Sequence, residues 1–370
     1  MVAALREAQV FIPGRVLNRQ FFHEVIQPIL AEQFPGLVYA AGLMGHGSDV
    51  LGFDTPRSMD HNWGPRGMIF LAEPDFEAHA EAISRTLAER LPTSFLGFPT
   101  NFTAPSDGYL VQRMAPIDEG PVNHLVKVFT VRSFVRHYLG FDPNDPITIA
   151  DWLTFPQQAL LEVVSGEVHC DPLGTLAATR ARFAFYPRDV WLYCMACQWG
   201  RIANELSFQA RSGERGDELG SRIIAARMVE EIMQLCFLLE RTYIPYSKWR
   251  GTAFAQLECA KVQRPLLQGV LDSADWRARQ RLLAASYSAL AEQHNALGVT
   301  EPIPTTPSPF PGRGYRVLDV APFIRALRDR IEDPVLRAPQ FPLGGIDQFI
   351  AHARINHENY VHRELRFLIR

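Results

Sequence analysis

Polar residues at fixed spacing mark the stretch from Gly47 to Trp63, which reads GSDVLGFDTPRSMDHNW. A Gly47-Ser48 pair opens it, and Asp60 and Asn62 follow after eleven intervening residues. Backbone NH groups of a glycine-containing turn and a serine hydroxyl can bind phosphate oxygens. Side chains at i and i+2 of an extended segment share one face, so we expect Asp60 and Asn62 to lie side by side. Their oxygens could coordinate Mg²⁺.

The charge of this predicted site is unusual. Two carboxylates in such an arrangement could share two divalent ions, which clamp the attacking and leaving oxygens of a phosphoryl displacement. Asn62 supplies an uncharged amide instead, a weaker ligand for a hard cation. The neighbouring strand expected at residues 125–131 carries Lys127, whose ammonium would repel a second metal ion. Lys127 could instead bind phosphate or a substrate carboxylate directly.

Two residues close to this pair have structural as well as functional interpretations. His61 points away from the Asp60 face, so a packed or hydrogen-bonded structural role is favoured over catalysis. Arg66 could reach phosphate, and a salt bridge explains it equally well.

The second half of the chain carries its own candidates. Lys248 lies between Tyr246 and Trp249, and this mixture of cation and aromatic faces would suit a nucleobase and its phosphates. For Trp249, packing in the core is a simpler explanation than binding of a nucleobase. Asp217 can cap a helix, which is a sufficient structural role, and it could also bind polar groups of a substrate. Cys194 and Cys197 have CxxC spacing inside a helical run, where core packing is favoured over redox or metal chemistry.

The elements that would position the first site follow from apolar spacing and turn residues. A helix over 18–34, kinked at Pro28, precedes a buried strand at 37–43 that leads into the glycine-rich turn. The segment 61–71 begins extended and ends apolar. Further expected elements are a helix at 76–91, strands at 109–114 and 125–131, and a helix at 133–139.

From residue 187 onward the pattern is helical. Long helices are expected at 189–210, 217–241 and 274–296, followed by a proline-rich connector over 302–311. The sequence therefore predicts an α+β protein with a mixed α/β domain at 1–150 and a mostly α-helical bundle domain at 151–370. A length of 370 residues suits two domains.

Composition narrows the classes of partner. The 37 basic and 40 acidic residues give a net charge of -3, which argues against a broad surface for nucleic acid or an anionic membrane. No signal-peptide pattern and no run of eighteen apolar residues is present, so we expect a cytoplasmic protein that acts on a small molecule. Oligomeric state is not indicated.

The stretch GSDVLGFDTPRSMDHNWGPR resembles the nucleotidyltransferase superfamily, and more closely a bacterial domain-of-unknown-function family related to aminoglycoside adenylyltransferases. Stretches of the second half carry the same resemblance: YPRDVW from Tyr186, GDELGSR from Gly216, YIPYSKWRGTAF from Tyr243, HNALG from His294 and GGIDQF from Gly344. The resemblance implies a nucleotidyltransferase-like first domain, with Gly47 and Ser48 at the phosphates and Asp60 as a metal ligand. A helical substrate-binding domain would follow.

The chain departs from the family pattern at two positions. Asn62 stands where the second acid is expected, and Lys127 where a later strand would supply a third. Two hypotheses follow. In one, the protein transfers a nucleoside monophosphate from ATP or another NTP to a small-molecule hydroxyl, with Asp60 and Asn62 on Mg²⁺ and either Glu162 or Asp171 as base. In the other, the same cleft binds a ligand or catalyses a metal-independent reaction through Lys127.

Overall fold

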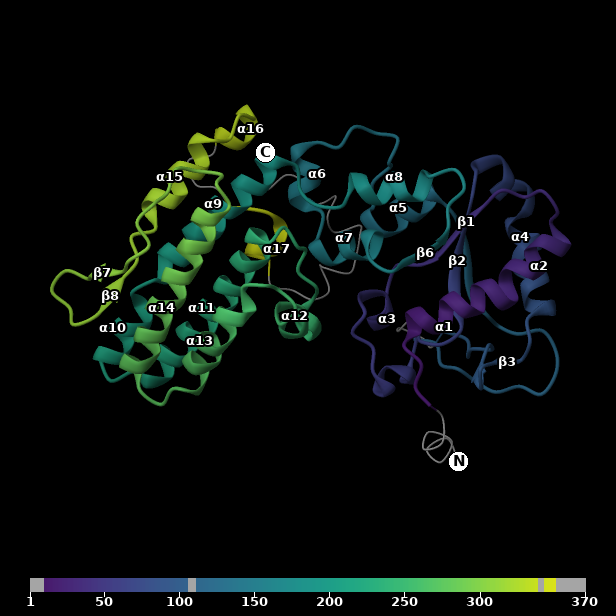
Figure 1. Ribbon diagram of the computed structural model, residues 1–370, viewed down its shortest axis with the longest axis horizontal. Coiled ribbons are helices and arrows are strands. Elements are labelled where there is room, and N and C mark those ends of the chain that lie inside the picture. The colour runs from purple at the N-terminus through teal and green to yellow at the C-terminus, as the bar shows by residue number, and fades with distance from the viewer. Residues whose placement is uncertain (1–9, 106–110, 339–342, 351–370) are drawn as a thin grey trace. The chain divides into compact units, whose positions relative to one another are not determined.

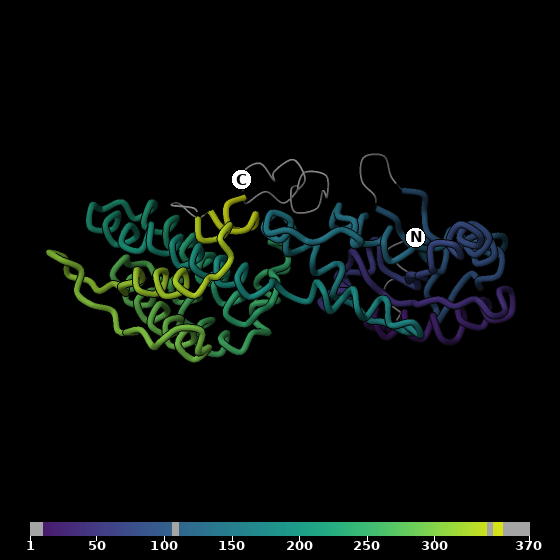
Figure 2. Tube along the Cα trace, turned by 90° about the horizontal axis from the view of Figure 1, so that it is seen from above, coloured from purple at the N-terminus to yellow at the C-terminus, as the bar shows by residue number. Residues whose placement is uncertain are grey.

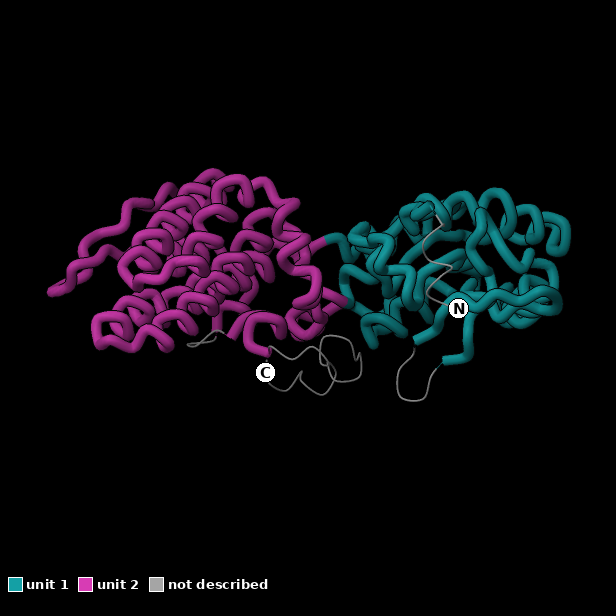
Figure 3. Tube along the Cα trace, turned by 90° about the horizontal axis from the view of Figure 1, so that it is seen from below, with its two compact units in different colours: residues 1–146, 159–184 teal, residues 147–158, 185–370 magenta. Residues whose placement is uncertain are grey.

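The computed structural model describes residues 10–105, 111–338 and 343–350, which are the coloured parts of Figure 2. The chain divides into two compact units (Figure 3). Unit 1 comprises residues 1–146 and 159–184, and unit 2 comprises residues 147–158 and 185–370. The α+β class expected from the sequence is confirmed. The boundary differs from the single one expected near residue 150, because the chain enters unit 2, returns to unit 1 and leaves it again after residue 184.

A mixed four-stranded sheet forms the centre of unit 1, in the order β5-β2-β1-β6. Strands β1, β2 and β6 of this sheet are labelled in Figure 1. Strand β1 is antiparallel to both of its neighbours, and β2 is parallel to β5. The return of the chain to unit 1 supplies β6, which explains the displaced boundary. The strands are β1 (Ala40–Leu43), β2 (Arg66–Leu71), β5 (Leu125–Thr130) and β6 (Glu167–Cys170).

The first long helix is interrupted by a π-helical turn. Helix α1 (Gly14–Phe21) leads into this turn at Phe22–Ile26, and α2 (Gln27–Gln33) follows. Pro28 has no NH to donate to the preceding turn, and the NH of Gln27 bonds to the carbonyl of Phe22 instead. The kink expected at Pro28 therefore takes the form of a wider turn just before the proline.

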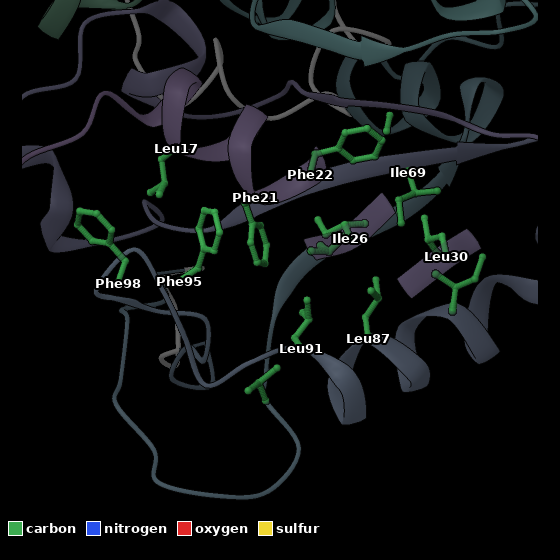
Figure 4. Packing of buried hydrophobic residues seen from close by; sticks show 14 of the residues in the cluster. Leu17, Phe21, Phe22, Ile26, Leu30, Ile69, Leu87, Leu91, Phe95 and Phe98 are labelled. Carbon is green, nitrogen blue, oxygen red and sulfur yellow. The ribbon is translucent and has the colours of Figure 1, made fainter. Parts of the chain in front are cut away.

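One face of the sheet packs on the first helices and on α4 (Glu73–Arg90), as Figure 4 shows. Ile69 of β2 and Leu87 of α4 meet the apolar side of the interrupted helix. Removing such side chains from water is the main favourable contribution to this arrangement. The labelled members of this core are Leu17, Phe21, Phe22, Ile26, Leu30, Ile69, Leu87, Leu91, Phe95 and Phe98.

The opposite face of the sheet carries α5 (Val131–Leu139). Phe134 of α5 packs edge-on against Phe70 of β2, with ring centroids 5.2 Å apart. Because side chains alternate along a strand, Lys127 shares this face with Phe129, which also contacts Phe134. Lys127 therefore lies on the α5 side of the sheet.

Short elements complete unit 1. They are α3 (Ser48–Leu51), a 3₁₀ turn at Pro56–Asp60, β3 (Ser94–Phe95), β4 (Phe98–Pro99), α7 (Gln157–Val164) and α8 (Thr175–Arg182). The strand expected at 109–114 is wrong where it can be assessed, because residues 111–114 form only an isolated bridge from Met114 to Phe102. Residues 109 and 110 lie outside the described residues.

Unit 2 is a helical bundle in which α9 contacts α11 and α15. The helix expected at 189–210 is divided into α9 and α10, and those expected at 217–241 and 274–296 correspond to α11 and α14. The helices are α6 (Ile149–Thr154), α9 (Arg188–Glu205), α10 (Phe208–Glu214), α11 (Glu218–Leu239), α12 (Ser247–Phe254), α13 (Ala260–Asp272), α14 (Trp276–Ala296), α15 (Ala321–Asp329), α16 (Pro334–Arg337) and α17 (Ile346–Phe349). A small pair of strands is formed by β7 (Ser308–Pro309), which lies within the proline-rich connector expected at 302–311, and by β8 (Arg316–Val317), which follows it.

Cys194 and Cys197 are free thiols buried on α9, so the core-packing interpretation is confirmed. Burial raises the pKa of Cys194 well above its usual value, which keeps this thiol protonated and unreactive. In the described parts of the chain, every helix is too short or too polar to span a bilayer.

Candidate functional site

The glycine-rich turn leaves the end of β1 and closes against two other elements of unit 1. Gly45 and Gly47 have φ of 81° and 144°, a region that side chains rarely adopt. The Gly45 NH donates to the Glu162 carbonyl at 2.9 Å, and a Cβ at Gly45 would overlap the Tyr138 hydroxyl. Helix α3 then begins at Ser48.

A buried ion pair lies directly against this turn. Arg66 donates from Nη2 to Asp49 Oδ1 at 2.7 Å and from Nε to Oδ2 at 3.1 Å, and Asp49 is 1% exposed. Arg66 also bonds to the carbonyl of His46 at 2.9 Å. A Cβ at Gly47 would overlap both partners, so glycine is required here to make room for the pair. Two roles were considered for Arg66, phosphate binding and a salt bridge. The structure shows the salt bridge.

Another acid of the same stretch is also structural. Asp54 accepts hydrogen bonds from the Gly14 NH at 2.7 Å and from Trp63 Nε1 at 3.0 Å. Trp63 is buried and packs edge-on against Phe98. Asp54 therefore ties the loop to the start of α1.

Asp60 and Asn62 do not stand side by side on a strand, and that expectation is wrong. Asp60 ends the 3₁₀ turn, and β2 begins only at Arg66. Thr55 caps the 3₁₀ turn through a reciprocal bond with Ser58, and this capping signal overrides an extended conformation.

Asn62 has a φ of 48°, a left-handed conformation that asparagine tolerates better than most residues. Its Oδ1 accepts from the Gln112 NH at 2.9 Å, and its own NH donates to the Gln112 carbonyl at 2.7 Å. The amide at position 62 therefore holds two loops together.

These donors do not fit a pair of Mg²⁺ ions. Asp60 provides one carboxylate, whose Oδ1 is 2.9 Å from His61 Nδ1, and the Asn62 oxygen is engaged by Gln112. Among the residues the structure describes, no group of three or more His, Cys, Asp or Glu side chains is placed to hold a metal.

Lys127 is exposed on β5, in register with Met68 of β2. Partial desolvation and the nearby Arg66 guanidinium lower the pKa of Lys127. Within the described chain, the ammonium makes neither an ion pair nor a hydrogen bond. A cation without a partner beside a glycine-rich turn is suited to an anionic ligand.

A histidine that the sequence interpretation missed is paired with a buried acid in the same place. His46 Nδ1 is 2.7 Å from Glu162 Oε1, and the two side chains are 54% and 5% exposed. A proton on Nδ1 directed at the carboxylate leaves the Nε2 lone pair free to accept one. Glu162 was proposed as a base from the sequence, and His46 could have been noticed because it lies two residues before Ser48.

Two residues of α5 face this histidine. Tyr138 lies edge-on to His46, with ring centroids 5.2 Å apart, and burial and Glu162 raise its pKa. Burial lowers the pKa of His137, and Lys127 and His46 add to the effect. We call His46, Arg66, Lys127, His137 and Glu162 the turn cluster.

Asp171, the other candidate base, lies elsewhere in unit 1. It follows β6, whose end pairs with the beginning of β1, whereas the glycine-rich turn follows the end of β1. Asp171 lines a separate cavity of about 180 Å³ and accepts a hydrogen bond from the Ala177 NH at 2.8 Å. It is not part of the turn cluster.

The remaining predicted residues belong to unit 2. Asp217 Oδ1 accepts from the Gly220 NH at 2.8 Å, so its capping role is confirmed. Lys248 is exposed, with its Nζ 4.8 Å from the centre of the Trp249 ring. The NH of Tyr246 donates to the Gln158 side chain at 3.1 Å.

Comparison with known proteins gives few matches. A family model described as a domain of unknown function (DUF4037) matches residues 152–250. The crystal structure of a nucleotidyltransferase-like protein from Exiguobacterium sibiricum 255-15 is similar over 76% of this chain and 77% of that chain, with 11% identity and a TM-score of 0.31. No curated protein matches the sequence.

Proposed function

We propose that unit 1 is a nucleotidyltransferase-like scaffold that binds the phosphates of a nucleoside triphosphate, such as ATP, at the turn cluster. In this proposal Lys127 takes over part of the neutralisation of phosphate charge that Mg²⁺ ions would otherwise provide. The Ser48 hydroxyl and the backbone at Gly47 would bind phosphate oxygens beside it.

The observation that carries this proposal is the unpaired cation. Lys127 lies near a second cation, Arg66, whose charge is already balanced by Asp49. A phosphate would therefore find one uncompensated positive charge on β5. Partial desolvation and Arg66 lower the pKa of Lys127, and a bound anion would oppose this shift by favouring the ammonium form.

A second candidate function, nucleotidyl transfer to a hydroxyl, is favoured by the pair of His46 and Glu162. In such a reaction the hydroxyl oxygen of the acceptor forms a bond to the α-phosphorus, and the bond from that phosphorus to pyrophosphate breaks. His46 Nε2 would take the hydroxyl proton, and Glu162 would stabilise the resulting imidazolium. Both groups lie in unit 1, on the side of the sheet where Lys127 lies.

Calorimetric titration of ATP, with and without Mg²⁺, tests the proposal. We expect binding in the absence of Mg²⁺, and we expect Lys127→Ala to weaken it about tenfold or more because a charged hydrogen bond is lost. Lys127→Arg should retain most of the affinity. Lys261→Ala, which removes an exposed lysine of unit 2, is the matched control.

Two results would contradict the proposal. One is ATP binding that Lys127→Ala leaves unchanged. The other is binding that occurs only with two Mg²⁺ ions per protein, because this would restore the role of metal that the proposal assigns to Lys127.

A further inference from the structure

We infer that Cys236 and Cys259 of unit 2 are a thiol pair that peroxide converts into a reversible disulfide, which makes them a modification site of this protein. The inference does not depend on the nucleotide site proposed for unit 1, because both cysteines belong to unit 2. Packing of α11 against α13 brings the pair together, and the spacing of the cysteines in the sequence does not indicate it.

Glu240 holds the backbones of the two cysteines close together. Its NH donates to the Cys236 carbonyl at 3.0 Å at the end of α11, and its Oε1 accepts from the Cys259 NH at 2.8 Å immediately before α13. The Cys236 thiol lies within hydrogen-bonding reach of the Cys259 sulfur. A disulfide between them therefore requires the sulfurs to move from this distance to a bonding distance of about 2 Å.

The two thiols differ in their access to solvent. Cys236 is fully buried, whereas Cys259 is partly exposed. Burial raises the pKa of the Cys236 thiol well above its usual value, which keeps this thiol protonated. Cys259 is therefore the thiol that meets a dissolved oxidant, and Cys236 is a second thiol held beside it. Cys194 and Cys197 of α9 are both buried, so that pair has no exposed member.

Hydrogen peroxide is a sufficient oxidant for the reaction. The Cys259 sulfur forms a bond to one peroxide oxygen, the O–O bond breaks, and the leaving hydroxide takes up the thiol proton to become water. The product is a sulfenic acid on Cys259. The Cys236 sulfur then bonds to the Cys259 sulfur, the S–O bond breaks, and the departing hydroxide takes the Cys236 proton as a second water. The two sulfurs together lose two electrons, and the peroxide gains them.

The disulfide would close a loop that contains α12. This loop includes Tyr246 and Lys248, two of the candidates from the sequence. Its residues 244–247 and Arg250 also line a polar cavity of about 290 Å³, together with Asp347 of α17. A cross-link between the ends of a loop limits the conformations that the unfolded loop can adopt. Oxidation is therefore expected to stabilise the part of unit 2 that carries α12.

Peptide mapping after brief treatment of the folded, full-length protein with hydrogen peroxide tests the inference. Remaining thiols are blocked with N-ethylmaleimide, and trypsin then separates the two cysteines because it cuts after Arg241 and Arg250. We expect one linked pair of peptides, residues 228–241 and 251–261, with a mass two hydrogens below the sum of the reduced peptides. Dithiothreitol should restore both reduced peptides.

Serine variants separate the roles of the two thiols. Cys236→Ser removes the second thiol, so Cys259 should stop at the sulfenic acid, which dimedone labels. Cys259→Ser, at a partly exposed position, should protect Cys236 from oxidation and tests the pair without a substitution in the core. Cys197→Ser removes a buried cysteine of the same unit and is the matched control, which should leave the linked peptides unchanged. Circular dichroism checks that each variant is folded.

Thermal unfolding followed by circular dichroism measures the effect of the link. Oxidation should raise the melting temperature of the wild-type protein by about 4 °C or more, and both Cys236→Ser and Cys259→Ser should lose this shift. Linked peptides without a rise in melting temperature would overturn the stabilising role of the disulfide.

The inference as a whole is overturned if peroxide leaves Cys259 of the wild-type protein as a free thiol or as a sulfenic acid. It is also overturned if Cys259 becomes linked to another cysteine or to a second molecule, or if the expected peptides are linked only after unfolding in urea.

Discussion

Single residues of the Gly47-to-Trp63 stretch mostly hold the loop in place. Asp49 is buried and bound twice by Arg66, and Asp54 joins Trp63 to the start of α1. Removing one partner of a buried ion pair leaves an uncompensated charge, at a cost of roughly 3–5 kcal/mol. The presence of Asp49 and Asp54 in this stretch is therefore explained by their contribution to stability, and no metal ion is needed to account for them.

Asn62 provides a test of whether the site has simply lost an acid. We expect Asn62→Asp to produce no Mg²⁺-dependent transfer of AMP, because this side chain is directed at the Gln112 backbone and not along a strand with Asp60. The measurement is release of pyrophosphate from ATP with and without Mg²⁺. A gain of about tenfold or more, equivalent to roughly 1.4 kcal/mol, would instead indicate a degenerate two-metal site.

Asp347 should make stability depend on pH. Its pKa is raised by burial to about 6 from an ordinary value of 3.8, so the folded state binds the proton more tightly than the unfolded state. Stability should therefore fall as the pH rises from about 4 to 6, by roughly 1–3 kcal/mol. Urea unfolding at a series of pH values measures this change.

Asp347→Asn supplies the comparison for that titration. An amide does not ionise, so the variant should lose this part of the pH dependence and be more stable than the wild type above pH 6. Parallel pH profiles for the two proteins would contradict the assignment.

At the scale of elements, the turn after β1 depends on glycine for two reasons that act together. Gly47 has a φ of 144°, and Asp49 and Arg66 occupy the space where a Cβ would be. We expect Gly47→Ala to destabilise unit 1 by roughly 1–3 kcal/mol or more, from backbone strain and loss of the ion pair. Chemical denaturation followed by fluorescence measures the effect.

Gly200 is the matched control for that substitution. It lies inside α9 with open space around it and an ordinary helical backbone. Gly200→Ala should therefore stabilise the protein by about 0.5–1 kcal/mol, the gain expected from helix propensity. If Gly47→Ala were equally harmless, the turn would not be held as described.

At the scale of the whole molecule, the path of the chain between the units decides which fragment can fold. Strand β6 pairs with β1, and α7 supplies the Glu162 that binds His46. A fragment of residues 1–150 lacks both and leaves β1 with an unpaired edge. We expect this fragment to show no cooperative thermal transition by circular dichroism.

A fragment of residues 1–184 retains the four strands and should unfold cooperatively. This fragment is the control for the shorter one, because the added residues 151–184 include the segment 159–184 that returns to unit 1. Equal cooperativity of the two fragments would show that β6 and α7 are dispensable for unit 1.

Much of the fold could be predicted from the sequence, because helix and strand periodicity are local properties. The interrupted helix before β1, the strand that carries Lys127, α5 and the helical second half all follow from apolar spacing and capping residues. Exact element boundaries and the π-helical turn at Phe22–Ile26 do not follow from apolar spacing. The sequence alone therefore predicted the α+β class.

What the sequence determined by itself is the α+β class, the long helices of the second half, and a glycine-rich turn followed by a later strand that carries Lys127. Only the tertiary structure decided which side chains are already paired. Asp49, Asp54 and Asn62 find partners far along the chain, and His46 meets an acid that is 116 residues away. Such pairings depend on how strands and helices pack, and local periodicity does not encode that packing. The positive charge of Lys127 that is available to a ligand could therefore be identified only from the tertiary structure.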